Sequence, residues 1–286
     1  MNFFEKRRRW TNFIMMGATF LAALIALIPL FFILSHLISK GLGSLHWSFF
    51  TELPAPVGEP GGGMANGIVG SFLLVGIACL IGLPVGILGG IYLSEYGRGK
   101  LGNIVRFATD MLNGIPSIVI GIFVYAFIVI RVKHFSALAG GIALGIMMIP
   151  TVLRSTETMM NLVPQSLREG SLALGIPYWR TLVSVVFKTA QSGILTGVLL
   201  AISRIAGETA PLLFTALGNQ FWNLKLDQPI AALPLQIFTY AISPYEDWQK
   251  QAWVGALVLI GLVLLLNIAA RTLIRNRLSK PTRGIR

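Results

Sequence analysis

The sequence predicts an all-α, polytopic membrane protein, and three features lead to this fold class. Of the 286 residues, 55% are hydrophobic and only 12% are charged. The mean hydropathy is +0.75, and the apolar residues come in long uncharged runs. An ordinary soluble domain carries about 25% charged residues. The chain has too few charges to cover a soluble surface, which argues against a soluble enzyme.

Six membrane spans are predicted from the apolar runs, because a transmembrane helix needs about 20 mostly apolar residues. Five runs qualify directly: Trp10–Ser39, Pro60–Ser94, Met111–Ile130, Phe135–Leu153 and Gln251–Ala270. A sixth, Thr189–Leu224, is interrupted near its middle by Arg204 and Glu208. The first run is far longer than the apolar region of a signal peptide, so we expect an uncleaved anchor.

The basic residues predict the orientation of these spans. With both termini in the cytoplasm, 17 of the 23 Lys and Arg residues fall on the cytoplasmic side, five fall outside, and Arg204 lies in the membrane. This distribution satisfies the positive-inside rule, although Arg131 and Lys133 in a short outer loop run against it. The net charge of +12 therefore reflects topology and does not indicate nucleic-acid binding.

Small residues and prolines indicate how the spans pack. Small residues let helix backbones approach closely in lipid, and they cluster in the second and fourth spans at Gly82, Gly86, Gly89, Gly90, Gly140, Gly141 and Gly145. Pro29, Pro84, Pro116 and Pro150 each fall within a span. Simple kinking explains such prolines, but the segment containing Gly114, Pro116 and Ser117 could instead open the backbone beside a transport pathway, as discontinuous helices do in transporters.

Catalytic and metal sites are not predicted. Cys79 is the single cysteine, and His36, His46 and His134 lack Cys or carboxylate neighbours at ligand spacing. The chain also has no Gly-x-x-x-x-Gly-Lys-Ser/Thr loop, because Gly99-Lys100 is followed by Leu101. We expect no cofactor on this chain.

The longest predicted inner loop, Arg154 to Lys188, reads as two short helices. Pro164 can begin the first helix, Gly175 can end it with a left-handed residue, and Pro177 can open the second. Leu167, Leu172 and Leu174 would give this loop a partly apolar surface that suits a soluble partner. The alternative is a helix lying on the lipid interface.

Within this loop, Glu169-Gly170-Ser171-Leu172-Ala173-Leu174-Gly175 resembles the coupling motif of the permease subunits of binding-protein-dependent ABC importers. The spacing from Glu to Gly fits that motif, but Gly170 and Ser171 stand where the family usually has two alanines. Four further segments resemble the phosphate-importing members of this family: 90–96, 114–121, 162–169 and 206–212.

This resemblance implies a type I, MetI-like bundle with a cytoplasmic coupling helix. The domains would be an N-terminal tail, anchor and outer loop (1–65), the transporter domain (66–275, with its coupling loop at about 154–188) and a basic tail (276–286). It also implies a sister permease (PstC), an ATPase dimer (PstB) that uses ATP and Mg, and an external phosphate-binding protein (PstS). The location would be a prokaryotic inner membrane.

Arg204 and Glu208 are the candidate substrate residues. Their spacing would put them on one helix face, one turn apart. An arginine at the membrane centre is costly and marks a functional candidate by default, and its guanidinium fork suits a tetrahedral oxyanion. Glu208 could hold Arg204 in place or accept a hydrogen bond from protonated phosphate. The two could also neutralise each other without contacting substrate.

The predicted function is the membrane permease of an ATP-driven phosphate importer. Two other functions stay open at this stage. One is the same type of permease for sulfate or molybdate, and the other is a self-sufficient secondary transporter or channel.

Overall fold

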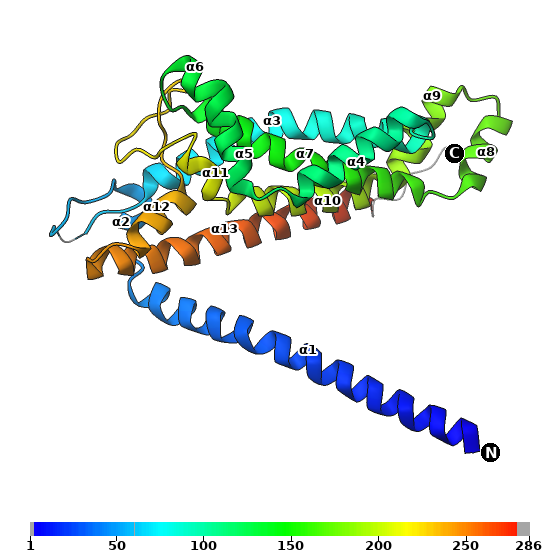
Figure 1. Ribbon diagram of the computed structural model, residues 1–286, viewed down its shortest axis with the longest axis horizontal. Helices are drawn as coiled ribbons and strands as arrows, with labels where there is room; N and C mark the ends of the chain where they lie inside the picture. Colours follow the sequence, from blue (N-terminus) through cyan, green and yellow to red (C-terminus); the bar gives the residue numbers. More distant parts are fainter. Residues whose placement is uncertain (1–2, 60, 279–286) are drawn as a thin grey trace, which may run out of the picture.

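The computed structural model describes residues 3–59 and 61–278 and is built from helices that run mostly along one direction (Figure 1). Two π-helical segments, η1 (Tyr125–Val129) and η2 (Leu182–Phe187), lie within longer helices. The α-helices are α1 (Phe3–Gly43), α2 (Ser48–Thr51), α3 (Ala65–Tyr96), α4 (Lys100–Gly114), α5 (Ser117–Val124), α6 (Ile130–Val132), α7 (Ala137–Asn161), α8 (Gln165–Ala173), α9 (Tyr178–Thr181), α10 (Lys188–Ala206), α11 (Ala210–Leu213), α12 (Leu233–Ala241) and α13 (Glu246–Leu278).

The core of the bundle is the contact between α3 and α7, the most extensive helix pair in the described chain. A Cβ atom on Gly86 would lie 2.7 Å from Val152 Cβ, and one on Gly90 would lie 2.5 Å from Thr156 Cβ. From the opposite helix, a Cβ on Gly145 would lie 3.3 Å from Ile81 Cβ. The predicted role of the glycines in close helix packing is confirmed.

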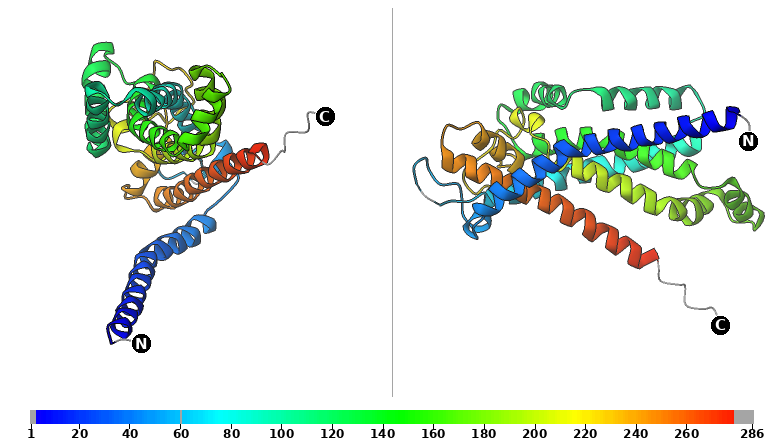
Figure 2. Two further views of the ribbon diagram at one scale, coloured as in Figure 1. Left: turned by 90° about the vertical axis from the view of Figure 1, so that its right-hand side faces the viewer. Right: turned by 90° about the horizontal axis from the view of Figure 1, so that it is seen from below.

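Helix α1 diverges from the rest of the bundle (Figures 1 and 2). It touches α13 only near its own C-terminal end, where the ring centroids of His36 and Trp253 lie 5.0 Å apart and Gly41 packs against Leu257. Most side chains before this contact are exposed. The predicted first span, Trp10–Ser39, lies entirely within α1.

Among the described residues, five helices are long and apolar enough to cross a membrane, and α4 with the helices up to Val132 passes the same test only as a bent pair, which is either a broken span or a re-entrant loop. The prediction of one span over Met111–Ile130 is therefore corrected. The chain turns by 104° between α4 and α5, where Ile115 and Pro116 are extended, with ψ of 130° and 137°. Pro29, Pro84 and Pro150 instead lie inside helices that continue past them.

The sixth predicted span is also corrected. The spanning helix begins at Tyr178, before the predicted start at Thr189, and α10 ends at Ala206, so the span does not continue to Leu224. The next segment is the short α11, followed by an irregular connection in which Leu217 and Ile230 form a single parallel bridge. The second predicted span also begins later than expected, since α3 starts at Ala65; Pro60 lies outside the described residues.

The two ends of the bundle differ in what they carry. Helices α8 and α9 project from one end, and α1 begins and α13 ends toward this same end (Figure 1). Helices α2, α6 and α12 lie at the opposite end. We call the end with α8 the inner end and the other the outer end.

We expect Gly90→Ala to destabilise the bundle, because its methyl group would meet Thr156 and the Leu153 carbonyl oxygen, 2.7 Å away. Overpacking of this kind costs about 1–3 kcal/mol. Thermal unfolding in detergent should show a lower Tm. The matched control is Gly76→Ala on the same helix, where a Cβ has nothing within 4 Å. Equal melting of both variants would contradict the packing role of Gly90.

Candidate functional site

Arg204 lies in the last turn of α10, and Glu208 lies just beyond the helix. Gly207 caps α10, so the expectation that both residues share one helical face is wrong. They still approach each other: Arg204 Nε lies 3.9 Å from Glu208 Oε1, at the limit of an ion pair and beyond hydrogen-bond distance. The Arg204 side chain is 47% exposed and that of Glu208 is 19% exposed. The guanidinium is loosely held and accessible.

The depth of Arg204 follows from the register of α10 on α7. A Cβ on Gly193 would meet Met159, and a Cβ on Gly197 would meet Ser155. The two helices therefore run antiparallel, and the same register continued by about two turns places Arg204 near Met148. Met148 is close to the middle of α7. Arg204 thus lies near half the depth of the bundle.

Two breaks in the helices are followed by segments that pack against each other. One separates α4 from α5 at Gly114–Ser117, and the other separates α10 from α11 at Gly207–Thr209. Helices α5 and α11, which follow the two breaks, pack against each other so closely that a Cβ on Gly121 would lie 2.6 Å from Pro211 Cα. Gly114 and Pro116 are exposed, and Ser117 is half-buried. The helical backbone is open at Ile115 and Pro116, with Gly114 ending α4 and Ser117 beginning α5; contact of Gly114, Pro116 and Ser117 with substrate stays a prediction.

The coupling loop, residues 162–177 with α9, has the predicted turn between two helices, but only the first helix is short, because α9, η2 and α10 form one continuous helix from Tyr178 to Ala206. Pro164 and Pro177 sit one residue before α8 and α9, and Gly175 is left-handed with φ of +75°. The loop is shorter than the predicted Arg154–Lys188, because α7 extends to Asn161 and Lys188 begins α10. Ser171 and Thr181 are buried and join α8 to α9 through hydroxyl oxygens 2.9 Å apart.

The predicted coupling residues divide between two faces of α8. Ser171 points into the loop, whereas Glu169, Gly170, Leu172, Ala173, Leu174 and Gly175 are exposed. Leu167 is exposed as well, and so is Trp179 on α9. These exposed apolar side chains form a surface at the inner end that suits a soluble partner.

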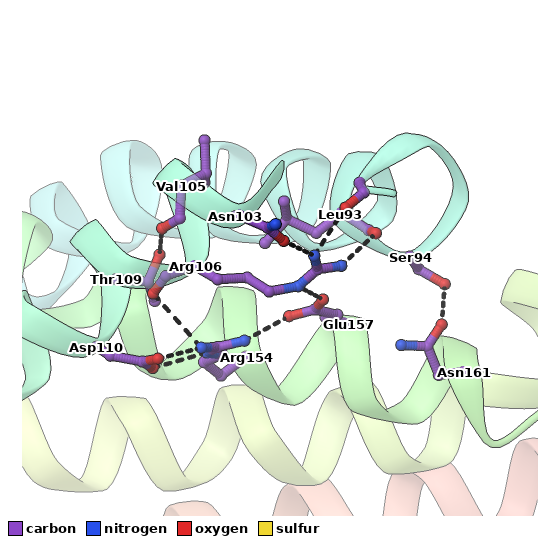
Figure 3. Close-up of polar contacts among 11 residues, drawn as sticks. Leu93, Ser94, Asn103, Val105, Arg106, Thr109, Asp110, Arg154, Glu157 and Asn161 are labelled. Atoms are coloured by element: carbon purple, nitrogen blue, oxygen red, sulfur yellow. Dashed lines mark hydrogen bonds and ion pairs between the residues drawn. The ribbon is translucent and has the colours of Figure 1, made fainter. Parts of the chain in front are cut away.

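A charged cluster at the inner half of the bundle, here called the inner network, was missed by the sequence analysis (Figure 3). Glu157 on α7 is buried, and it accepts hydrogen bonds from Arg106 Nε at 2.6 Å and Arg154 Nη1 at 2.9 Å. Arg154 also donates to Asp110. Arg106 donates to the carbonyl oxygens of Gly97 and Leu93, at 2.7 and 3.1 Å. The network fastens α4 to both α3 and α7.

A sequence signal for the inner network exists. Arg106 and Asp110 are four residues apart, and Arg154 and Glu157 are three apart, which are spacings that put side chains on one helix face. Two such pairs of opposite charge border neighbouring apolar runs. The topology prediction places Arg106 and Arg154 in cytoplasmic loops, so it does not show that they pair.

The described residues contain no group of three or more His, Cys, Asp or Glu side chains that could hold a metal ion. Near mid-depth, the functional groups are the half-exposed guanidinium of Arg204, the partly buried carboxylate of Glu208 and the non-helical backbone that follows α10. This arrangement can bind an anion and release it, because the cation is weakly paired.

Comparison with known proteins identifies relatives over nearly the whole chain. Residues 82–279 match the family described as "Binding-protein-dependent transport system inner membrane component". The phosphate transport system permease protein PstA of Yersinia pestis is 49% identical over 271 residues, which cover 94% of this chain and 92% of that protein. The Haemophilus influenzae PstA is 46% identical, covering 94% and 96%, and Mycobacterium tuberculosis PstA 1 is 36% identical, covering 92% and 88%.

A solved structure shows the same fold. A chain of the inward-facing MetNI methionine ABC transporter superposes with a TM-score of 0.58 at 21% identity, covering 74% of this chain and 92% of that chain. At this identity the similarity concerns the fold alone.

We expect Glu157→Gln to lower stability more than Asp110→Asn. The first change removes the carboxylate shared by Arg106 and Arg154, and breaking a buried ion pair costs up to about 3–5 kcal/mol. Asp110 is the control, because its side chain is 57% exposed and pairs with one arginine; exposed pairs contribute about 0–1 kcal/mol. Denaturation of both purified variants measures the difference, and a larger loss for Asp110→Asn would contradict the central position of Glu157.

Proposed function

Because this chain belongs to the inner-membrane components of binding-protein-dependent transport systems, we propose that it is the permease subunit of an ATP-driven phosphate importer. The relatives named as phosphate permeases span nearly its full length. Hydrolysis belongs to a partner ATPase, which uses ATP and Mg, and this chain supplies half of the membrane passage.

The observation that carries the proposal is the position of Arg204. An arginine near the middle of a bilayer should face protein or water, because lipid exposure costs about 2.5–3.5 kcal/mol or more. The described helices of this chain leave its side chain 47% exposed. A second subunit must therefore enclose this surface, and an aqueous passage between the two subunits would present the guanidinium to substrate.

Phosphate suits the groups at this level. A guanidinium donates in a planar fork that matches the oxygens of a tetrahedral anion. Glu208 lies close enough to Arg204 that its carboxylate could accept a hydrogen bond from an OH group of a protonated phosphate bound to the guanidinium. Fully ionised sulfate has no such OH group. The loose pairing between Arg204 and Glu208 lets both side chains turn to an anion without breaking a strong hydrogen bond. Gly114, Pro116 and Ser117 would contribute backbone and hydroxyl groups from the other helix break.

The proposed partners follow from the family. They are the sister permease PstC, a dimer of the ATPase PstB and the external phosphate-binding protein PstS. The exposed apolar surface of α8 and α9 would dock with the ATPase, and motion of that docked helix would alternate access to Arg204 between the two sides. The inner end then faces the cytoplasm, together with both termini, in a prokaryotic inner membrane.

We predict that Arg204→Lys sharply reduces phosphate uptake while ATPase assembly stays intact. Lysine keeps the charge but lacks the planar fork. A hydrogen bond to a charged group contributes about 1.5–3 kcal/mol, so losing one corresponds to roughly a 10- to 100-fold fall in uptake. Uptake of labelled phosphate into proteoliposomes containing the whole complex gives the measurement, and co-purification of the ATPase reports assembly.

The double change Arg204→Gln with Glu208→Gln separates a transport role from a structural one. It removes both charges and so leaves no unpaired buried charge. A transport role predicts that assembly is normal and uptake stays low. Assembly and phosphate uptake near the wild-type level in the double variant would show that Arg204 and Glu208 only neutralise each other and have no role in transport.

Docking gives another prediction. Gly175→Val should weaken association with the ATPase, because a β-branched residue tolerates the φ of +75° poorly. Strain at such a position costs about 1–3 kcal/mol. The matched control is Gly58→Val in the loop before α3, where the backbone is left-handed as well, with φ of +85°, and a Cβ has nothing within 4 Å. Co-purification of the ATPase with each variant measures the effect, and normal association of the Gly175→Val protein would remove the coupling assignment.

A further inference from the structure

A second ionic contact at the inner end joins segments that are far apart in sequence. Glu95, near the end of α3, accepts hydrogen bonds from Arg168 Nη1 on α8, at 2.6 Å to Oε1 and 2.8 Å to Oε2. The Tyr178 hydroxyl, at the start of α9, donates to the same carboxylate. Arg168 Nη2 donates to the carbonyl oxygen of Met160, 3.0 Å away, in the last turn of α7. We call Glu95, Arg168 and Tyr178 the latch.

The ion pair of the latch is sheltered from water, whereas Tyr178 lies at its edge and is 42% exposed. The Glu95 side chain is 2% exposed and that of Arg168 is 14% exposed. An ion pair away from solvent is screened little by salt and holds its geometry more firmly than a surface pair. The neighbouring residue Glu169 is exposed on the other face of α8. The two adjacent side chains therefore face different surroundings: Arg168 contacts α3 and α7, and Glu169 is exposed to a partner.

The latch ties α8 to α3, a helix with which it has little other contact. The main packing partners of α8 are α9 and η2, which lead into α10. The chain itself connects α8 only to α7 and to α9. Without the Glu95–Arg168 contact, a displacement of α8 would be transmitted to α3 only through α7, α9 and η2. With this contact, the displacement of α8 also acts directly on the inner end of α3, the helix that packs most closely on α7.

We propose that the Glu95–Arg168–Tyr178 latch is the positioning element that makes α3 move with the coupling loop, so that ATP-driven displacement of α8 opens and closes the membrane passage. This proposal rests on the proposed function for its cycle, and it adds the residues that transmit the motion. Loss of the latch should leave the docking surface of α8 and α9 intact but uncouple hydrolysis from transport.

The test measures phosphate imported per ATP hydrolysed in proteoliposomes containing the whole complex, supplied with the phosphate-binding protein. Glu95→Gln and Arg168→Gln should each retain the ATPase while this ratio falls about tenfold, the scale of one lost charge-assisted hydrogen bond. The double variant Glu95→Gln with Arg168→Gln, which carries no unpaired buried charge, should assemble normally and stay uncoupled.

The matched control is Asn161→Ala. Asn161 Oδ1 accepts a hydrogen bond of 2.8 Å from the Ser94 hydroxyl and so ties α7 to α3 beside the latch (Figure 3). Ser94 itself is unsuitable as a control, because its hydroxyl also lies 3.4 Å from Glu95 Oε1. The ratio of the Asn161→Ala complex should equal that of the wild type. A purely structural role for Glu95 would lower hydrolysis and uptake together and leave the ratio unchanged, which would overturn the proposal.

A covalent replacement sharpens the test. In a Cys79→Ala background, Glu95→Cys and Arg168→Cys can be bridged by a short bifunctional thiol reagent. If bridging restores the phosphate imported per ATP, a direct link between α3 and α8 is sufficient for coupling, as proposed. If this ratio stays low despite complete bridging, the proposal is overturned. Failure of the wild-type complex to import phosphate would count against the proposed function instead; the ratio would then be measured with whichever oxyanion the wild type does import.

Discussion

The close approach of α3 and α7 is the constraint on which the remaining structure depends. Lipid offers no hydrophobic driving force between helices, so association rests on packing and polar contacts. Glycines at Gly86, Gly90 and Gly145 let the two backbones meet, and α7 then serves as the surface for α4, α5, α10 and α11. The register of α10 on α7 fixes the depth of Arg204. The packing of the end of α3 on α7 also sets the position at which Glu95 pairs with Arg168 of the coupling loop.

Backbone hydrogen bonding explains where the helices are allowed to stop. A break inside a bilayer leaves polar backbone groups that must be satisfied by protein or by water. The two breaks, at Gly114–Ser117 and Gly207–Thr209, are followed by α5 and α11, which cover one another. The Thr209 hydroxyl lies 3.4 Å from the carbonyl oxygen of Pro234, so α12 also supports the second break. The packing around the breaks holds them in place, and the second break leaves backbone groups outside a helix directly after Arg204.

The charges of the bundle fall into two classes that differ in how tightly they are held. In the inner network and the latch, Glu157 and Glu95 are buried and make hydrogen bonds of 2.6–2.9 Å to arginines. These contacts fasten α4, α7 and α8 to their neighbours at the inner end. Arg204 and Glu208 instead lie 3.9 Å apart and are partly exposed. Tight pairing suits the transmission of force, and loose pairing suits transient contact with an anion.

The sequence by itself determined the helical membrane fold, the positions of most spans, the glycine-mediated packing and the turn at Gly175, because each depends on local composition or on one residue's backbone freedom. Only the tertiary structure decided that α10 stops at Ala206, that the third predicted span bends by 104° at Pro116, and that Glu95 meets Arg168. An apolar run does not show where its helix ends, since proline interrupts the chain at 116 but not at 84 or 150. Contacts between residues 73 positions apart arise from helix packing, which a single sequence does not encode as a readable pattern.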